Sequence, residues 1–166
     1  MTATWWRQES PIGPLTVLAC ARGVRRIQFG TAVFVDDAVN VDVDAVEACD
    51  DEVAIELDEY FAGRRARFTM PVDLSAVDAG FPRTVYELLY REVSFGETVS
   101  YSELAEMAGH PGAARAVGNA MSRNPVPIVV PCHRVVAAGG RIGGYGPSGV
   151  DTKRMLLALE GVELSE

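Results

Sequence analysis

A cysteine, a histidine and a carboxylate are the strongest candidates for chemistry in this sequence. Cys132 and His133 stand side by side in "IVVPCHRVV", directly after an apolar run that ends at Pro131. Glu160 lies near the end of the last helical pattern, "DTKRMLLALEG". A thiol, an imidazole and a carboxylate that orients the imidazole form the general arrangement of an activated cysteine nucleophile. The alternative is a buried thiol that serves as a small hydrophobic core residue.

The adjacency of Cys132 and His133 constrains the local backbone. In a regular strand, neighbouring side chains point to opposite faces, so His133 would face away from the thiol. Pro131 has no backbone donor, which favours the end of a strand at this position. For His133 to serve Cys132, the chain has to turn here or a water has to bridge the thiol and the imidazole, and Pro131 favours the turn.

Neither a metal site nor a nucleotide cofactor is predicted. His110, His133 and the three cysteines are scattered without a C-x-x-C pair, whereas zinc sites usually show paired ligands. "GYGPSG" satisfies G-x-G-x-x-G, but only 17 residues follow Gly149. A dinucleotide fold needs an acidic residue about 20 residues further on. The six glycines from Gly139 to Gly149 instead predict a loop whose backbone a ligand can approach closely.

Charge is unevenly distributed along the 166 residues. The net charge of −8 by itself argues against a nucleic-acid partner. Residues 1–80 hold 7 basic and 14 acidic residues, yet no acid falls between Glu106 and Asp151. That interval carries four arginines, so an anionic partner can be accommodated there.

Cysteine usage and hydropathy predict the compartment. Three cysteines, an odd number, and the polar opening "MTATWWRQES" without a secretory apolar region indicate a reduced, cytoplasmic protein. Because no apolar run approaches the ~18 residues of a membrane helix, no membrane partner is expected.

The first half predicts a small α/β domain with an antiparallel sheet, over residues 1–78. Three short strands are expected at Trp5 to Glu9, Leu15 to Ala21 and Val24 to Phe29, with turns at "SPIGP" and "ARG". Apolar residues at steps of three and four then predict a helix that is ended by Gly63 and buries Val46, Cys49, Val53, Leu57 and Tyr60. The alternation in "RFTMPVDL" predicts one more strand.

The second half predicts a mostly helical domain over residues 79–166. A helix over "FPRTVYELLYREV" buries Val85, Leu88 and Leu89. Ser100 and Glu103 form a capping box that opens a helix ending at Gly109, and "AARAVGNAM" forms the next helix. Two short helices joined by a glycine turn outline a helix-turn-helix, with an ordinary αα-hairpin as the alternative. The whole chain is thus predicted to be an α+β protein with a winged-helix-like C-terminal domain.

Three ordered blocks resemble segments of the O6-alkylguanine-DNA alkyltransferase family, the methylated-DNA–protein-cysteine methyltransferases. The block "PVPIVVPCHRVV" is similar to the family's active-site segment. "VSYSELAEMAGHPGAARAVGNAMSRNP" resembles its DNA-binding helix-turn-helix and hinge, and "GGYGPSG…KRMLLALEG" its substrate loop and final helix. The likeness covers Phe81 to Gly161, and "SPIGPL" fits the family's first hairpin, whereas residues 30–65 are not diagnostic.

This resemblance implies a single-turnover DNA repair protein without a cofactor. It would bind double-stranded DNA in the minor groove, flip out an O6-alkylguanine, with O4-alkylthymine as a second candidate, and move the alkyl group irreversibly to Cys132. His133 would take the thiol proton through a water, and Glu160 would orient the imidazole. Tyr101 would donate to guanine N3. The attack requires a thiolate, so a lowered thiol pKa is expected.

The resemblance also assigns DNA and pocket contacts. Arg115 would enter the duplex in place of the flipped base, and Arg123 would also contact the DNA. Three small residues beside Arg115 would allow close approach to the narrow groove: Ala114, Ala116 and Gly118. The pocket would be formed by Asn124, Met121, Pro127, Val135, Tyr145 and Gly146. A monomer is expected, with cooperative assembly along DNA as an alternative.

Two departures and several competing functions accompany this resemblance. The loop containing Gly146 is one residue longer than in typical members, and Asn119 stands where glycine is common. A non-enzymatic alkyltransferase-like lesion sensor would lack the cysteine that is present here as Cys132. A helix-turn-helix regulator would leave Cys132 and Glu160 unexplained, and a cysteine hydrolase would leave Arg115 unexplained.

Overall fold

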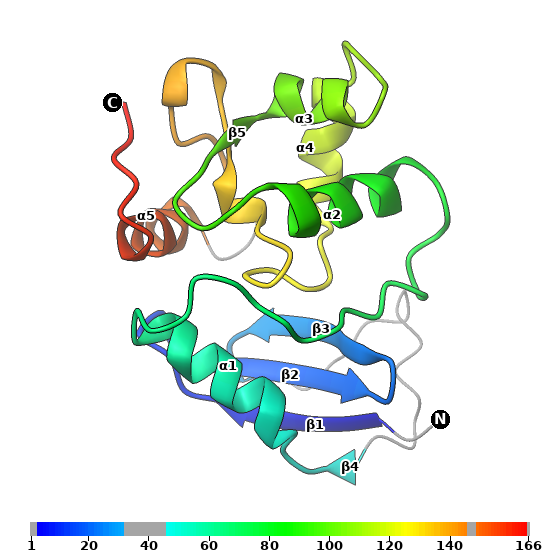
Figure 1. Ribbon diagram of the computed structural model, residues 1–166, viewed down its shortest axis with the longest axis vertical. Helices are drawn as coiled ribbons and strands as arrows, with labels where there is room; N and C mark the ends of the chain where they lie inside the picture. The colour runs from blue at the N-terminus through cyan, green and yellow to red at the C-terminus, as the bar shows by residue number, and fades with distance from the viewer. Residues whose placement is uncertain (1–2, 32–45, 146–148, 166) are drawn as a thin grey trace. The chain divides into compact units, whose positions relative to one another are not determined.

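The computed structural model describes residues 3–31, 46–145 and 149–165 (Figure 1). The chain forms two compact units, Met1–Ala76 and Val77–Glu166. Both units mix helices with strands, as an α+β protein should. Within the described residues, no helix is long and apolar enough to cross a membrane.

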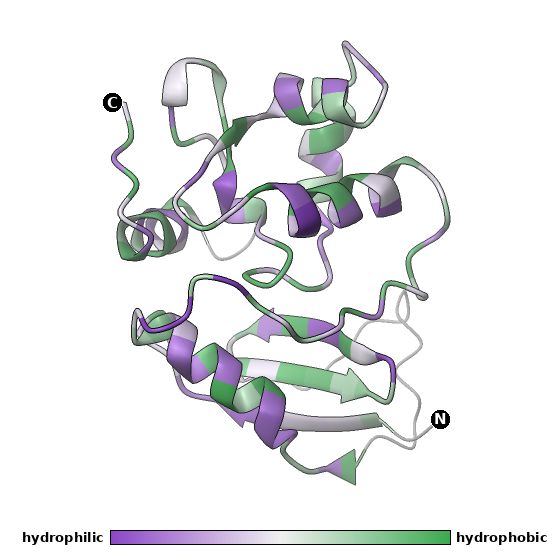
Figure 2. Ribbon diagram, viewed as in Figure 1, coloured by the Kyte–Doolittle hydropathy of each residue, from purple (hydrophilic) through white to green (hydrophobic). Residues whose placement is uncertain are grey.

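A four-stranded sheet forms the base of the first unit, in the order β3-β2-β1-β4. β1 (Ala3–Gln8), β2 (Leu15–Cys20) and β3 (Gly23–Phe29) pair antiparallel and confirm the predicted meander. β4 (Val46–Glu47) adds a parallel edge next to β1. β2 is an interior strand and the most buried of the four, and it is the most continuously apolar of them in Figure 2.

The predicted helix of this unit begins later than expected. α1 spans Asp51–Phe61 because the Asp50 side chain caps it, accepting a hydrogen bond from the Val53 backbone N–H at 3.3 Å. Val46 lies in β4, and Cys49 is exposed, so the prediction that both are buried on the helix is wrong. Gln8 fastens α1 to the sheet by donating to Asp58 Oδ1 at 2.6 Å.

The strand predicted over "RFTMPVDL" is also wrong. Among these residues, only an isolated bridge between Val24 and Val72 has strand pairing. Pro71 has no N–H for a sheet ladder. Glu56 instead supplies the acceptors, since its carboxylate receives the backbone N–H groups of Thr69 at 2.8 Å and Met70 at 3.3 Å.

Three helices build the helix-turn-helix outline of the second unit. α2 (Phe81–Glu92) starts with proline in its first turn and packs against α3 (Tyr101–Met107) and α4 (Ala114–Ser122). Ser100 caps α3 by accepting the Glu103 N–H at 3.0 Å, which confirms that helix start. A turn through Gly109, at φ 80°, separates α3 from α4.

Short elements complete the second unit. β5 (Val99–Ser100) pairs parallel with β6 (Val135–Val136). The 3₁₀ turn η1 (Cys132–Arg134) precedes β6, and η2 (Ala138–Gly140) follows it. α5 (Gly149–Leu159) ends immediately before Glu160. The sequence patterns did not predict β5 or β6, because two residues are too few to show a period.

Candidate functional site

The β5–β6 pair brings distant parts of the sequence to one place. Ser100 lies opposite Val136, so Tyr101, the first residue of α3, sits close to the segment that follows η1. Gly143 approaches the same tyrosine, because a Cβ at Gly143 would lie 3.2 Å from Tyr101 Oη. α5 contacts η1, and Glu160, the residue after α5, lies within hydrogen-bond distance of His133 in η1.

The chain turns at Cys132, as predicted, although the preceding run is not a strand. Val126 to Val130 form a tight loop closed by the hydrogen bond from Val130 N to Val126 O at 2.9 Å. Ile128 in this loop has φ 75°, a costly conformation for a β-branched residue. Because Cys132–Arg134 then form a 3₁₀ turn, the side chains of Cys132 and His133 do not point to opposite faces as they would in a strand.

Asn124 holds this loop at both ends. Its Nδ2 donates to Val130 O at 2.8 Å, and its Oδ1 accepts the Val126 N–H at 2.9 Å. The residue lies just after α4, so it connects that helix to the cysteine segment. Asn124 therefore links α4 to the cysteine segment, and its role as a hinge stays a prediction.

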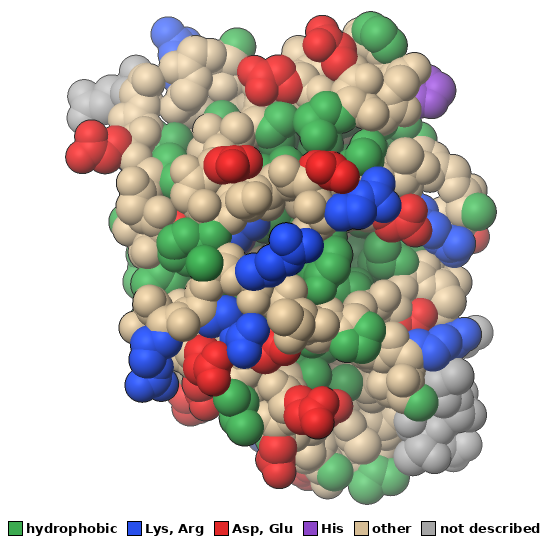
Figure 3. Space-filling model, viewed as in Figure 1, with side chains coloured by type: hydrophobic (Ala, Val, Ile, Leu, Met, Phe, Trp, Pro, Cys, Tyr) green, Lys and Arg blue, Asp and Glu red, His purple; other side chains and the backbone are tan. Residues whose placement is uncertain are grey.

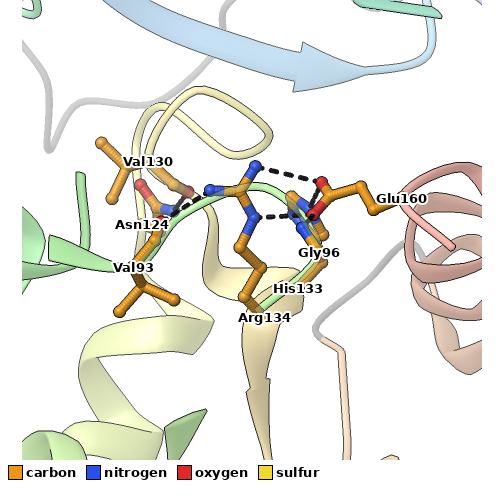
Figure 4. A network of polar contacts seen from close by, with 7 residues as sticks. All are labelled: Val93, Gly96, Asn124, Val130, His133, Arg134 and Glu160. Carbon is orange, nitrogen blue, oxygen red and sulfur yellow. Dashed lines mark hydrogen bonds and ion pairs between the residues drawn. The ribbon is translucent and has the colours of Figure 1, made fainter. Parts of the chain in front are cut away.

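His133, Arg134 and Glu160 form a buried ionic group (Figure 4). His133 Nε2 lies 2.6 Å from Glu160 Oε2, and neither side chain is accessible to solvent. Arg134 makes two bonds to the same carboxylate, from Nε to Oε1 at 2.8 Å and from Nη2 to Oε2 at 3.1 Å. Its Nη1 donates to Val93 O at 2.7 Å.

The carboxylate of this group is ionised over the whole neutral range. Burial opposes ionisation of Glu160, but His133 and Arg134 outweigh it and lower the pKa to about 2. Burial lowers the pKa of His133, since it disfavours the imidazolium, while Glu160 acts in the opposite direction. His133 is therefore a neutral imidazole paired with an ionised, arginine-bound carboxylate.

Cys132 is a protonated thiol in this state of the protein. Burial raises the pKa of its thiol, although the side chains of Asn124 and Tyr145 and the charge of Lys153 act to lower it. The expectation of a lowered thiol pKa is therefore wrong for the protein without DNA. Because the thiol is neutral at rest, formation of a thiolate needs a base close by.

The residues predicted to form the pocket differ in their burial. Pro127, Val135 and Tyr145 are buried, and Met121 is half-buried at the end of α4. The carbonyl of Val135 accepts a hydrogen bond from Lys153 Nζ at 2.6 Å. Burial raises the pKa of Tyr101, and Cys132 adds to the effect, so its phenol is a neutral donor. Gly146 lies outside the described residues.

The residues predicted to meet DNA lie on and beside α4. Val117 and Ala120 of α4 face the core. The residues predicted to contact DNA are exposed or half-buried: Ala114, Arg115, Ala116, Gly118 and Arg123. Gly118 has open space where a side chain would be. On the face drawn in Figure 3, acidic and basic side chains are interspersed.

Sequence reasoning missed three buried polar residues that shape the site. Arg134 follows the Cys–His pair directly, and Lys153 lies on α5 with its Nζ bonded to Val135 O at 2.6 Å. Tyr86 donates to Ala120 O at 2.6 Å and so ties α2 to α4. The mostly apolar segment around Arg134 was an available signal for that residue, whereas Lys153 stands among the polar residues Asp151, Thr152 and Arg154 and gave none. The described residues contain no cluster of three metal-ligating side chains.

The second unit thus joins a helix-turn-helix element to a buried Cys–His–Glu group, which defines a DNA-binding protein with a cysteine-centred site. The model of the 6-O-methylguanine DNA methyltransferase DNA-binding domain matches residues 80–162. The model of the ribonuclease-like domain of the same proteins matches residues 6–74. The chain belongs to the 6-O-methylguanine DNA methyltransferase family.

Individual relatives agree over nearly the full chain. The methylated-DNA–protein-cysteine methyltransferase of Mycobacterium leprae is 40% identical over 153 residues, covering 92% of this chain and 88% of that protein. The human protein of the same name is 40% identical, covering 95% of this chain and 80% of the relative. The crystal structure of Mycobacterium tuberculosis OGT in complex with DNA has a TM-score of 0.81 and 35% identity, over 95% of this chain and 92% of that one.

Proposed function

We propose that this protein repairs alkylated DNA by moving the alkyl group from O6 of guanine to its own Cys132. The observation that carries this proposal is the buried Cys132 beside His133, in a unit whose family model is a 6-O-methylguanine DNA methyltransferase domain. The relatives named above are methylated-DNA–protein-cysteine methyltransferases, and one was crystallised with DNA. O4-alkylthymine is a second candidate substrate.

The reaction is a displacement at the alkyl carbon. His133 accepts the Cys132 proton through a water, and the sulfur then attacks the alkyl carbon in line with its bond to O6. The S–C bond forms as the C–O6 bond breaks, and guanine leaves with the electron pair. Tyr101, whose phenol stays protonated, donates to guanine N3 and stabilises the charge that develops on the base. The thioether product is not reversed by water, so each chain acts once.

The substrate atom is buried inside duplex DNA, so the base has to leave the stack. α4 would enter the minor groove with its accessible side, where the small side chains of Ala114, Ala116 and Gly118 permit close approach. Arg115 would fill the place of the flipped base, and Arg123 would contact a phosphate. Asn124 would transmit the position of α4 to the cysteine loop.

The pocket would recognise the flipped guanine through backbone and side-chain groups. The carbonyls of Cys132 and Val135 would accept the exocyclic amine. Met121, Pro127 and Tyr145 would surround the alkyl group. The protein would act as a cytoplasmic monomer, with cooperative assembly on DNA as the alternative.

Mass spectrometry tests this proposal directly. Incubation with duplex DNA containing O6-methylguanine should add one methyl group to the peptide that contains Cys132, at one equivalent per chain. DNA with unmodified guanine is the control, and Cys132→Ser should remain unmodified. Binding without transfer would instead indicate a lesion sensor, and continued turnover would indicate a hydrolase.

A further inference from the structure

We propose that Arg134 is a positioning residue that anchors Glu160 and supplies its counter-charge, so that His133 stays neutral with a free lone pair on Nδ1. This inference rests on the proposed function, in which Nδ1 takes the proton of Cys132. Arg134 would touch neither the alkyl group nor the thiol. It would act only through Glu160 and His133.

The hydrogen bonds of Glu160 leave its carboxylate one orientation. Oε1 accepts from Arg134 Nε at 2.8 Å and from the Gly96 backbone N–H at 3.1 Å. Oε2 accepts from Arg134 Nη2 at 3.1 Å and lies 2.6 Å from His133 Nε2. Figure 4 shows the Arg134 guanidinium facing the carboxylate from the side opposite the rest of the Glu160 side chain. A planar fork of this kind fixes a carboxylate better than a single point charge does.

This orientation decides which imidazole nitrogen carries the proton. An ionised carboxylate can only accept, so Nε2 has to be the donor in the 2.6 Å contact. In a neutral ring the lone pair then lies on Nδ1. Nδ1 is buried and, within the described part of the chain, has no hydrogen-bond partner. It is therefore available to accept a proton, which in the proposed function comes from Cys132.

The charge of Arg134 is needed as well as its shape. A buried carboxylate beside an imidazole, with no other cation, is stabilised by protonation of that imidazole. The imidazolium would carry protons on both nitrogens and could accept none from Cys132. Because arginine is always charged, Arg134 neutralises Glu160 without using a proton from His133.

Among the charged groups around His133, one favours the imidazolium and the others favour the neutral ring. Glu160 raises the pKa of His133, whereas Arg134 on η1 and Lys153 on α5 both lower it, in addition to burial. Cys132 is a neutral thiol at rest, because burial raises its pKa. Glu160 is thus the only group among these that favours the imidazolium, and Arg134 is bonded to it directly.

Nitrogen-15 NMR of labelled histidine tests the proposal without any substrate. The chain has two histidines, His110 and His133, so a His110→Gln variant assigns the signals and wild-type His110 is an internal reference. Wild-type His133 should be neutral with the proton on Nε2 at pH 7. In Arg134→Met it should be the imidazolium at pH 7, and in Arg134→Lys, which keeps the charge, it should stay neutral.

The rate of alkylation of Cys132 by free O6-benzylguanine supplies the second readout. Arg134→Met should react roughly 10–100-fold more slowly than wild type at pH 7, and the deficit should shrink as the pH rises and His133 loses its proton. Arg91→Met is the matched control, because Arg91 is an exposed arginine of the same unit, paired with Glu92. It should leave both readouts unchanged.

Three results would overturn the proposal. An imidazolium at His133 in the wild-type protein at pH 7 would do so even if Arg134→Met failed to fold. A neutral His133 in folded Arg134→Met, or a deficit that is the same at every pH, would reduce Arg134 to a structural role. Since the NMR measurement needs no alkyl transfer, failure of the proposed function would appear separately, as an unmodified Cys132.

Discussion

Lys153 donates a hydrogen bond of 2.6 Å from its buried Nζ to the backbone carbonyl of Val135. A second bond of 3.1 Å reaches Gly144 O, so one ammonium group joins α5 to β6 and to the loop before residue 146. Burial lowers the pKa of Lys153 to about 8, although Cys132 acts against this shift. The same charge acts to lower the pKa of the Cys132 thiol. Lys153 is therefore both a structural link and a source of positive potential for a thiolate.

Replacing Lys153 by methionine should weaken both roles. Loss of the positive charge removes stabilisation of the thiolate, so the pKa of Cys132 should rise. Alkylation by free O6-benzylguanine at pH 7 should slow on the order of tenfold, the effect of about 1.4 kcal/mol. The two carbonyls left without this donor should cost about 1–3 kcal/mol of unfolding free energy.

A pH–rate profile and urea denaturation measure the two effects of Lys153→Met, with the exposed Arg154→Met of the same helix as control. An unshifted profile would contradict the electrostatic role.

Glu160 should make the protein sensitive to acid. Its pKa of about 2 in the folded protein lies below the usual value of 4.5, so the unfolded chain binds the proton more readily. The resulting stabilisation is complete above about pH 4.5 and is lost as the pH falls towards 2, a total on the order of 3 kcal/mol. Denaturant unfolding of wild type and Glu160→Gln should therefore converge at low pH. At pH 7 the variant should be less stable by roughly 3–5 kcal/mol, because Arg134 is left buried without its counter-ion. A difference that is independent of pH would contradict this assignment.

Arg115 should matter for DNA and not for the chemistry at sulfur. If its side chain replaces the flipped base, Arg115→Ala should slow repair of duplex DNA by roughly 10–100-fold, because the unstacked state loses its stabilisation. Reaction of Cys132 with free O6-benzylguanine should be unchanged, since that substrate needs no flipping. Arg91→Ala controls for loss of one positive charge elsewhere on the unit. Equal losses with both substrates would remove Arg115 from the flipping step.

Long, regular elements of the fold were predictable, and irregular ones were not. The meander and α2 follow from alternation and from helical spacing over six or more residues. The start of α1 was misjudged because Val46 and Cys49 continue the apolar spacing by chance, while Asp50 fixes the actual first turn. The segment around Pro71 alternates like a strand, but the backbone N–H groups of Thr69 and Met70 donate to the Glu56 side chain. A tertiary partner of this kind leaves no local signal.

The reactive pair was visible in the sequence, and its electrostatics were not. Adjacent Cys132 and His133, with a proline before them, gave the turn and the nucleophile–base hypothesis. That hypothesis missed Arg134, although it is the next residue, because bidentate contact with Glu160 depends on how α5 meets η1. It also missed that burial raises the thiol pKa. Spacing along a chain predicts which groups are near, whereas pKa values depend on burial and on partners from other elements.

Gly118 gives the sharpest test of where α4 meets DNA. It lies three residues after Arg115, on the same accessible side of the helix, and a Cβ there would meet no atom of the protein within 4 Å. Gly118→Ala should therefore raise the unfolding free energy by roughly 0.5–1 kcal/mol, the helix preference of alanine over glycine. Gly118→Leu should also fold normally, but its side chain would obstruct a minor groove only about 6 Å wide. Fluorescence anisotropy should then show at least roughly tenfold weaker binding to duplex DNA for the leucine variant, with free O6-benzylguanine reacting at the wild-type rate. Undiminished DNA affinity in a folded Gly118→Leu protein would place this side of α4 away from the groove.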